Sequence, residues 1–413
     1  MSLPSNKIEI VATIDRQFEL ITRGCEHIYS LEELRHKLER SAETATPLRV
    51  KLGMDPTAPD LTFGHAVVLG KMRDFQDAGH RAVLIIGDYT ARIGDPSGKS
   101  KTRPVLSVEE VDKNAQTYFD QAGKIIDLSA GKLEIRRNSE WLAPLNFADV
   151  IRLAGQVTIA RMLERDTFDR RMKAGVEIYM HELFYPVMQA YDSVMVQADV
   201  EIGGTDQTFN NLLGRDFQKN AGRPPQVVVI MPLLVGLDGK EKMSKSLGNY
   251  IAVTEPAADM FAKAMSISDE LMRNYFELLT RIPGGDVERL LDPGRSHPRD
   301  AKVTLAKSIV ERFHGDRAAE SAADEFFRIH GAGKTGLPDD MPEIVVPAEM
   351  GVVDLVRLAG FAPSNGEARR LIAENGIRHN GAVLTDHAVT IKLNTGDVLQ
   401  RGKRKFVRLQ VGS

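Results

Sequence analysis

Two short apolar runs with an amphipathic segment between them constrain the fold of this 413-residue chain most strongly. Residues 48–53, LRVKLG, and residues 82–87, AVLIIG, end in glycine and are typical of buried strands. Between them, Val67, Val68 and Met72 recur at helical spacing. A strand, a helix and a strand within about forty residues indicate a βαβ unit. The predicted fold class is therefore α/β, with a doubly wound parallel sheet.

The remaining pattern predicts further parts after this sheet. Residues 226–235, QVVVIMPLLV, predict another buried strand, and from Glu255 the apolar spacing becomes helical. Residues 331–348 are rich in glycine and proline and predict a linker. Beyond them we expect two helices, the second capped by Ser364, and then short strands to the end of the chain.

Composition excludes some classes of protein and localises the positive charge. The single cysteine, Cys25, excludes an internal disulfide framework and a cysteine-based zinc site, and it fits a reducing cytosol. The first twenty residues lack an apolar signal core, and the longest apolar run, 227–237, is too short to span a membrane. Residues 351–413 hold ten Lys/Arg against five Asp/Glu, a net charge of +5, so residues 1–350 carry −8. We expect only this tail to meet a polyanion.

The run DPTAPDLTFGH, residues 55–65, places a glycine and a histidine where a strand passes into a helix. Helix N-termini at the carboxyl ends of parallel strands offer unpaired N–H groups to phosphate. Gly64 would let a nucleotide approach the backbone, and His65 could donate to phosphate oxygens. The alternative interpretation is an ordinary helix start with a structurally satisfied histidine.

A lysine-rich loop, GLDGKEKMSKSLGNYI, follows the strand predicted at 226–235. It carries Lys240, Lys242 and Lys245 and no arginine, so it offers mobile point charges. Such ammonium groups suit the charge that develops on a leaving pyrophosphate. The alternative interpretation is a solvated basic loop.

Taken together, the TFGH and KMSKS strings resemble the two signatures of class I aminoacyl-tRNA synthetases. The segments KLGMDPTAPD, IGDPSGK, YPVMQAYDS and EIGGTDQTFN are similar to the bacterial tyrosyl-tRNA synthetase family, and the likeness extends over essentially the whole chain. The resemblance implies activation of L-tyrosine by ATP to tyrosyl-adenylate and pyrophosphate, followed by transfer to the 3′-terminal adenosine of tRNA(Tyr). It also implies a cytoplasmic homodimer, with ATP and Mg²⁺ as a substrate complex, no tightly bound cofactor and no metal site.

The resemblance implies a division of the chain as well. It predicts a Rossmann-like catalytic domain over residues 1–254 and an α-helical anticodon-binding domain over 255–335. A linker over 336–348 would then lead to a small α+β RNA-binding domain over 349–413, similar to ribosomal protein S-four.

The matching motifs imply roles for particular residues. The substrate's amino group, phenolic hydroxyl and far side would be held by Asp95, Tyr185, Gln189, Asp192 and Gln207. ATP would be bound by Gly53, Asp55, Gly64, His65, Gly203, Asp206, Met243, Ser244 and Lys245, with Gly204 in the same stretch. The catalytic set would be Thr57, Thr62, His65, Lys242 and Lys245. Contacts to tRNA would come from Arg357, Arg369, Arg370, Arg378, Lys403, Arg404, Lys405 and Arg408.

Two positions depart from the family pattern. Thr62 replaces the first histidine of the signature, so that phosphate contact should be weaker or water-mediated. Lys51 stands where one subgroup has a tyrosine that helps to bind the phenolic hydroxyl, which leaves the second partner of that hydroxyl open. Two alternatives stay open: a tryptophanyl-tRNA synthetase, and a catalytically impaired RNA-binding protein of the same fold.

Overall fold

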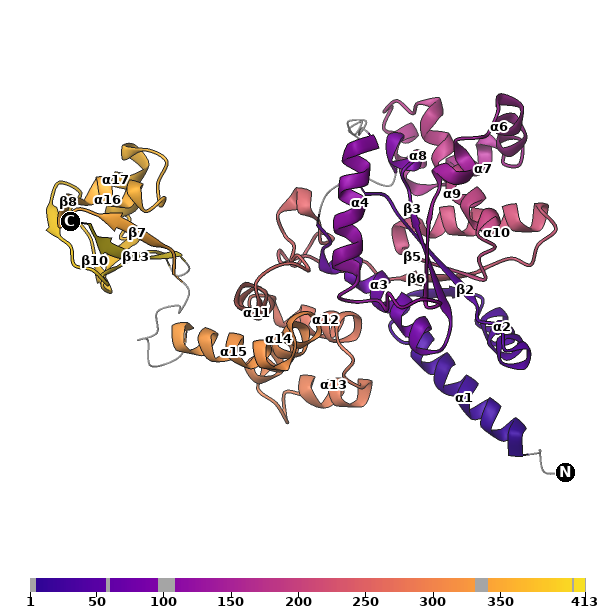
Figure 1. Ribbon diagram of the computed structural model, residues 1–413, viewed down its shortest axis with the longest axis horizontal. Helices are drawn as coiled ribbons and strands as arrows, with labels where there is room; N and C mark the ends of the chain where they lie inside the picture. The colour runs from indigo at the N-terminus through magenta and orange to yellow at the C-terminus, as the bar shows by residue number, and fades with distance from the viewer. Residues whose placement is uncertain (1–4, 57–59, 96–107, 331–340, 403–404, 413) are drawn as a thin grey trace. The chain divides into compact units, whose positions relative to one another are not determined.

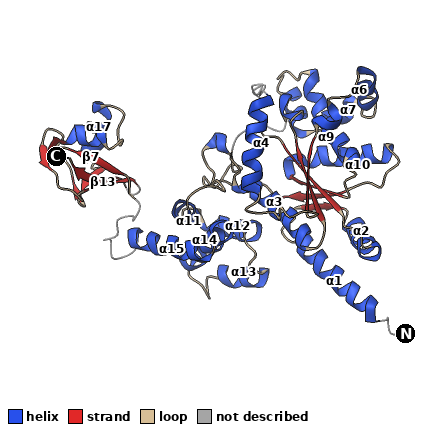
Figure 2. Ribbon diagram, in the orientation of Figure 1, coloured by secondary structure: helices blue, strands red, loops and turns tan. Residues whose placement is uncertain are grey.

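The computed structural model describes residues 5–56, 60–95, 108–330, 341–402 and 405–412. Figure 1 follows them along the chain, and Figure 2 marks helices and strands. The chain forms two compact units, Met1–Glu320 and Ser321–Ser413. Each unit is described by itself below.

The described part of the first unit contains a six-stranded sheet in the order β1-β6-β5-β2-β3-β4. Its strands are β1 (His27–Tyr29), β2 (Arg49–Met54), β3 (Arg81–Ile86), β4 (Leu133–Arg137), β5 (Val200–Gly204) and β6 (Val227–Met231). All neighbours are parallel except β1, which runs antiparallel to β6. The predicted parallel α/β sheet is confirmed, with α3 (Phe63–Asp77) as the helix between β2 and β3.

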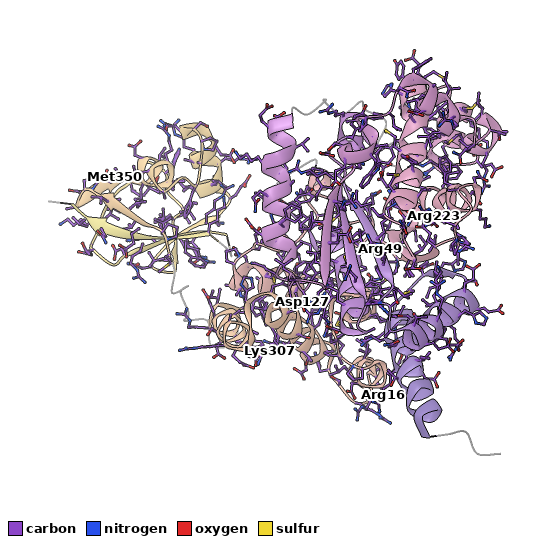
Figure 3. All side chains as sticks on the ribbon, turned by 45° about the vertical axis from the view of Figure 1, so that its right-hand side comes forward. Arg16, Arg49, Asp127, Arg223, Lys307 and Met350 are labelled. Carbon is purple, nitrogen blue, oxygen red and sulfur yellow. The ribbon has the colours of Figure 1, made fainter. Side chains whose placement is uncertain are left out.

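Side-chain contacts also join strands that are not neighbours in the sheet. Arg49, at the start of β2 and labelled in Figure 3, pairs with Glu134 of β4 at 2.8 Å. On one face, Val83 and Ile85 of β3 pack with Met188 of α9 (Met180–Met195). Helix α10 (Thr208–Asn220) packs on α9 and touches β5 and β6, while α3 packs on β2, β3 and β5.

The connections around this sheet are largely helical. They comprise α1 (Ser5–Thr22), α2 (Leu31–Thr44), η1 (Thr90–Arg92), α4 (Val108–Ala122), α5 (Ser139–Leu142), α6 (Phe147–Ala154), α7 (Ile159–Leu163), α8 (Asp166–Lys173), η2 (Thr205–Gln207) and η3 (Lys245–Leu247). No helix of the described residues is long and apolar enough to cross a membrane.

The helical pattern predicted from Glu255 onward is confirmed. It comprises α11 (Ala257–Met265), η4 (Asp269–Leu271), α12 (Met272–Leu279), α13 (Gly284–Leu291), α14 (Pro298–His314) and α15 (Asp316–His330). The Phe313 ring of α14 stacks on the Phe63 ring at the start of α3, with centroids 5.2 Å apart. The Tyr275 hydroxyl of α12 donates to the Val235 carbonyl at 2.8 Å. These contacts join the helices to the start of α3 and to the segment before the lysine-rich loop.

The second unit has its own core and a mainly antiparallel sheet. Its elements are β7 (Glu343–Val346), β8 (Glu349–Gly351), α16 (Val352–Leu358), α17 (Asn365–Ala373), β9 (Ile377–His379), β10 (Ala382–Val383), β11 (Thr390–Lys392), β12 (Val398–Arg401) and β13 (Lys405–Val411). The described strands pair in the orders β10-β9-β12-β13-β7 and β11-β8. The Ser364 cap is confirmed, because its side chain accepts the Glu367 N–H. Met350, labelled in Figure 3, packs on this core.

The predicted boundaries at 254, 335 and 348 stay predictions. Helices α11 to α14 lie within the first compact unit, and α15 begins in it. Residues 331–340, the first part of the segment predicted as a linker, lie outside the described part of the chain, and Glu343–Val346 form β7 of the second unit's sheet.

Candidate functional site

A cavity of about 740 Å³ opens at the carboxyl ends of β2 and β5. The sheet order makes this the switch point, because the chain proceeds from β2 to β3 and β4 on one side and to β5 and β6 on the other. Ligands of doubly wound sheets bind at such points. The cavity is lined by Gly53 near the end of β2 and Asp55 just after it, by the start of α3 and by α9. It is also lined by Gly203, Gly204, Asp206 and Gln207 at the end of β5, and by Glu241, Lys242, Met243, Ser244, Lys245 and Leu247.

The first signature forms the N-terminus of α3. Thr62 is its N-cap, only 3% exposed, and its backbone N–H donates to His65 Nδ1 at 3.1 Å. The Thr62 hydroxyl lies 3.0 Å from the same nitrogen. Since Nδ1 accepts, this hydrogen-bond pattern assigns the ring proton to Nε2. Thr62 therefore orients the histidine that lines the cavity, whereas a phosphate contact of its own stays a prediction.

The charge state of His65 follows from its surroundings. Burial, with the nearby Lys245 ammonium as a smaller cause, lowers the pKa of His65 from 6.5 to about 4. The imidazole is therefore neutral near pH 7 and can only donate through Nε2. A neutral donor suits phosphate oxygens without adding a fixed charge.

The second signature lies beside the first because two backbone segments pair. The Phe63 N–H donates to the Ile251 carbonyl at 3.0 Å, and the Val253 N–H donates to the Leu61 carbonyl at 2.9 Å. Within the loop, the buried Asn249 accepts the Ser244 N–H at 2.8 Å. Its amide also donates to Asp238 at 2.7 Å. The Asn249 side chain thus holds two parts of the loop, Ser244 and Asp238, together.

The lysines of this loop have different positions. Lys242 pairs with Asp206 at 3.1 Å, and the half-buried Lys245 donates to the Asp60 carbonyl. Burial lowers the pKa of Lys245. Lys242 and Lys245 line the cavity together with Met243 and Ser244, whereas Lys240 is exposed and does not line it.

The opposite end of the cavity contains a buried carboxylate. Asp192 of α9 is 4% exposed and accepts Trp141 Nε1–H at 2.7 Å. Asn138 Nδ2 lies 3.4 Å from its other oxygen. Burial raises the pKa of Asp192 from 3.8 to about 7, against the lowering effects of Lys51 and these two donors. Asp192 and Asn138 both line the cavity, so a hydroxyl entering here meets an acceptor and an amide.

Polar side chains between the two ends form a connected set. The Tyr185 hydroxyl donates to Asp55 at 2.9 Å, and Thr90 donates to the other Asp55 oxygen at 2.8 Å. Burial raises the pKa of Tyr185 well above 10, so this hydroxyl stays a donor. Asp95 accepts from Arg165 at 2.9 Å and from Gln207 at 2.7 Å.

Glycine is required at one wall of this cavity. A Cβ on Gly203 would lie 2.5 Å from Asn211 Nδ2 and 3.0 Å from Gln207 Cβ. A larger residue would therefore displace the turn that carries Asp206 and Gln207. In contrast, a Cβ on Gly53 would meet nothing within 4 Å.

Lys51 is not part of the cavity surface. Its ammonium is fully buried and bound to Glu201 at 2.8 Å, to the Ser193 hydroxyl at 2.7 Å and to the Gln189 carbonyl at 3.0 Å. Lys51 therefore has no donor left for a substrate hydroxyl, whereas Asn138 lines the cavity and lies 3.4 Å from Asp192.

The structure thus brings together most of the residues predicted from the sequence. One cavity is lined by Gly53, Asp55, Thr62, Gly64, His65, Asp95, Tyr185, Gln189, Asp192, Gly203, Asp206, Gln207, Lys242, Met243, Ser244 and Lys245. Thr57, Lys403 and Arg404 lie outside the described residues. In the second unit, Arg357, Arg369, Arg370, Arg378 and Lys405 are exposed and Arg408 is half-buried.

The sequence reasoning missed several residues that contact the site, four of which hold predicted ones. Asn138 and Trp141 bind Asp192, Arg165 binds Asp95, and Glu201 pairs with Lys51. A signal existed for the last pair, because each charge interrupts an otherwise apolar strand. The other contacts join residues 51 to 70 positions apart, which no local pattern reports.

Comparisons with known proteins agree with this geometry. Residues 43–331 match the family model described as tRNA synthetases class I (W and Y). The tyrosine–tRNA ligase of Ralstonia nicotianae is 49% identical over 95% of this chain and 99% of its own. That of Deinococcus radiodurans is 50% identical over 96% of each chain. The tyrosyl-tRNA synthetase of Archaeoglobus fulgidus, solved with L-tyrosine, is similar in fold, with a TM-score of 0.60, 24% identity, and coverage of 75% of this chain and 99% of that one.

The raised pKa of Asp192 predicts a pH-dependent stability. The native carboxyl ionises near pH 7 and an unfolded one near 3.9, so native Asp192 binds its proton more tightly. Its contribution to stability therefore falls as the pH rises from about 4 to about 7. Asp192→Asn removes this titration and should raise the free energy of unfolding of the ligand-free protein more at pH 8 than at pH 5, by about 3 kcal/mol. Urea unfolding at both pH values measures the difference; an equal effect at both would contradict the prediction.

Proposed function

The chain belongs to the class I tRNA synthetases for tryptophan and tyrosine, and on this premise we propose how its cavity carries out the tyrosine–tRNA ligase reaction of its relatives. First, tyrosine and ATP give tyrosyl-adenylate and pyrophosphate; then the tyrosyl group passes to the terminal adenosine of tRNA(Tyr). The observation that carries the proposal is one cavity with a buried carboxylate at one end and a histidine and two lysines at the other.

Asp192 is the group that selects tyrosine. Its carboxylate accepts the phenolic hydroxyl, and Asn138 is close enough to be that hydroxyl's second partner. Phenylalanine would leave the buried carboxylate unpaired, which costs binding energy. Rejection of phenylalanine by about 10⁵ is known for tyrosyl-tRNA synthetases; it is a property of those enzymes rather than a value from this cavity.

The substrate's amino group lies near Asp95, Tyr185 and Gln189. Arg165 and Gln207 hold the Asp95 carboxylate, and Asp55 holds the Tyr185 hydroxyl. These fixed oxygens receive an ammonium group and point the substrate carboxylate toward ATP. Such positioning lowers the entropy cost of bringing the two reactants together.

ATP lies along the signatures. Gly53 and Gly203 leave room for the nucleoside, with Asp206 beside its ribose. A tyrosine carboxylate oxygen forms a bond to the α-phosphorus while the bond from that phosphorus to the bridging oxygen of pyrophosphate breaks. His65, Lys242 and Lys245 stabilise the negative charge that grows on the leaving pyrophosphate. Mg²⁺ enters with ATP as part of the substrate.

In the second step, a ribose hydroxyl of the terminal adenosine attacks the tyrosyl carbonyl carbon, and AMP leaves. The basic tail, residues 351–413, binds the tRNA through the exposed cations of α16, α17 and the strands that follow them. Helices α11 to α14 provide the anticodon contact, as in the predicted domain plan. We assign this reaction to the cytoplasm.

The tryptophan alternative has no observation in its favour, since the relatives that match at 47–50% identity are tyrosine–tRNA ligases. Nor does Thr62 favour an impaired protein. Its hydroxyl and its backbone N–H both contact Nδ1 of His65, so Thr62 orients the histidine of the proposed nucleotide site.

A second copy of the chain covers an exposed apolar surface on the first unit. Phe147 is 79% exposed and Met180 68% exposed, although both belong to helices. The same helical region, seen together at α6 to α9 in Figures 1 and 2, exposes Ile151, Ile159, Met172, Val176 and Tyr179. Exposed apolar groups of this extent mark an interaction surface, so we assign it to the homodimer.

Pyrophosphate exchange with each proteinogenic amino acid tests the function. Exchange should depend on tyrosine alone. Lys245→Ala should slow it strongly, by about 2–4 kcal/mol of barrier, with little change in tyrosine affinity. Lys240→Ala, on the same loop but outside the cavity, is the matched control and should keep most of the rate. Exchange with another amino acid, or normal exchange in Lys245→Ala, would refute the assignment.

A single charged residue introduced into the apolar surface tests whether it forms the dimer interface. Phe147→Asp should convert the dimer to a monomer in analytical ultracentrifugation, because a carboxylate in an apolar interface is left without solvent. Leu31→Asp, at a residue that is 51% exposed on α2, is the control and should stay dimeric. A monomeric wild-type protein, or a dimeric Phe147→Asp variant, would remove this surface from consideration.

The basic tail should matter only for the second step. Deleting residues 349–413 should leave tyrosine-dependent exchange nearly intact, because every cavity residue lies before position 248. Charging of tRNA should fall by orders of magnitude, and its salt dependence should flatten because fewer counterions are released. Both half-reactions measured across a salt series check this. Charging with an unchanged salt slope would show that the tail does not bind the RNA.

A further inference from the structure

Two buried opposite charges lie behind the tyrosine end of the cavity. Lys51 of β2 and Glu201 of β5 are partners in the parallel register, and they are 0% and 1% exposed. Their charged atoms are 2.8 Å apart. A buried ion pair often adds no stability over an apolar pair of similar size, so its presence here calls for another reason.

The contacts of Lys51 exclude a direct role in binding. Its three N–H groups are taken up by Glu201, the Ser193 hydroxyl and the Gln189 carbonyl. An ammonium has three donors, so none remains for a substrate. Lys51 can act on a substrate only through the residues around it.

Glu201 is closer to the cavity, which it helps to line. One oxygen binds Lys51, and the other accepts from the Ser193 hydroxyl at 3.1 Å and from Gln226. Ser193 follows Asp192 directly on α9. The pair is therefore linked by hydrogen bonds to the helix that presents the selective carboxylate.

Among the main causes that shift the pKa of Asp192, the charged groups are Lys51 and Glu201. Helix α5 contributes the neutral donor Trp141, and Asn138 before it contributes a second neutral donor. Lys51 lowers the pKa of Asp192 and Glu201 raises it, while burial is the largest influence and raises it to about 7. The two charges thus oppose each other at one carboxyl group.

We propose that Lys51 and Glu201 are positioning residues that set the charge of Asp192, and thereby the pH range in which the cavity selects a phenolic hydroxyl. This inference rests on the proposed role of Asp192 as the acceptor of that hydroxyl. The ionised carboxylate accepts the hydroxyl and penalises phenylalanine; the protonated carboxyl penalises it less. Selectivity should therefore rise with pH through the titration of Asp192.

Removing either charge should shift the pH midpoint of tyrosine binding, and the two removals should shift it in opposite directions. Lys51→Met removes the positive charge and leaves Glu201 unopposed, so the pH midpoint of tyrosine binding should rise by about one unit. Glu201→Gln should lower the midpoint by a similar amount. The double variant loses both effects and should return close to the wild type, although neither residue remains.

The experiment is tyrosine and phenylalanine binding without ATP, by equilibrium dialysis from about pH 5.5 to about pH 8.5, where the tyrosine phenol stays protonated. Phenylalanine carries the same α-amino and α-carboxyl groups, so the ratio of the two affinities cancels their titration. Lys71→Met is the matched control: Lys71 is also buried, 3% exposed, and pairs with Asp74 at 2.9 Å away from the cavity. Its midpoint should equal that of the wild type. A purely structural role of the pair would weaken binding at every pH and leave the midpoint in place.

Glu201→Gln decides the outcome, because it is isosteric and keeps an oxygen that can accept from Lys51. A lowered midpoint with tyrosine still bound supports the proposal, even if Lys51→Met fails to fold. An unmoved midpoint, or tyrosine binding in the wild type that does not vary with pH, overturns it. If the wild type binds no tyrosine at any pH, the proposed function itself fails.

Discussion

The parallel pairing of β2 with β3 on one side and β5 on the other is the constraint on which the site depends. Because the chain reverses its direction of winding there, the ends of β2 and β5 diverge and leave room between their loops. Asp55 follows one strand, and the Gly203–Gly204 turn ends the other. The same pairing sets Lys51 opposite Glu201, so the strand register determines both the opening of the cavity and the charges beneath it.

Burial then decides what the polar groups of the cavity can do. It makes His65 a neutral donor, raises the pKa of Asp192 to about 7 and keeps the Tyr185 hydroxyl protonated. Burial affects different kinds of groups at the two ends of the cavity. At one end of the cavity Lys242 pairs with Asp206 beside the neutral His65, whereas at the other end Trp141 donates to the buried carboxyl group of Asp192.

The signatures work together because backbone pairing holds them, and not because they are near in sequence. Residues 61–63 pair with residues 251–253, and Phe313 stacks on Phe63 from the helical side. Tyr275 ties the same helical region to Val235 at the root of the lysine loop. The helices after the sheet thus support the lysine-rich loop, while the second unit has a core of its own.

The sequence by itself determined the elements and the chemistry that depend on local order. The apolar runs of β2 and β3, the helix start at Thr62, the lysine loop and the Ser364 cap follow from spacing within a few residues. Only the tertiary structure decided that Trp141 and Asn138 hold Asp192, that Arg165 holds Asp95, and that Lys51 turns to Glu201 and not to the substrate. These contacts join residues from about fifty to one hundred and fifty positions apart. They depend on strand register and on the face that each helix buries, and neither is encoded within a single segment of the chain.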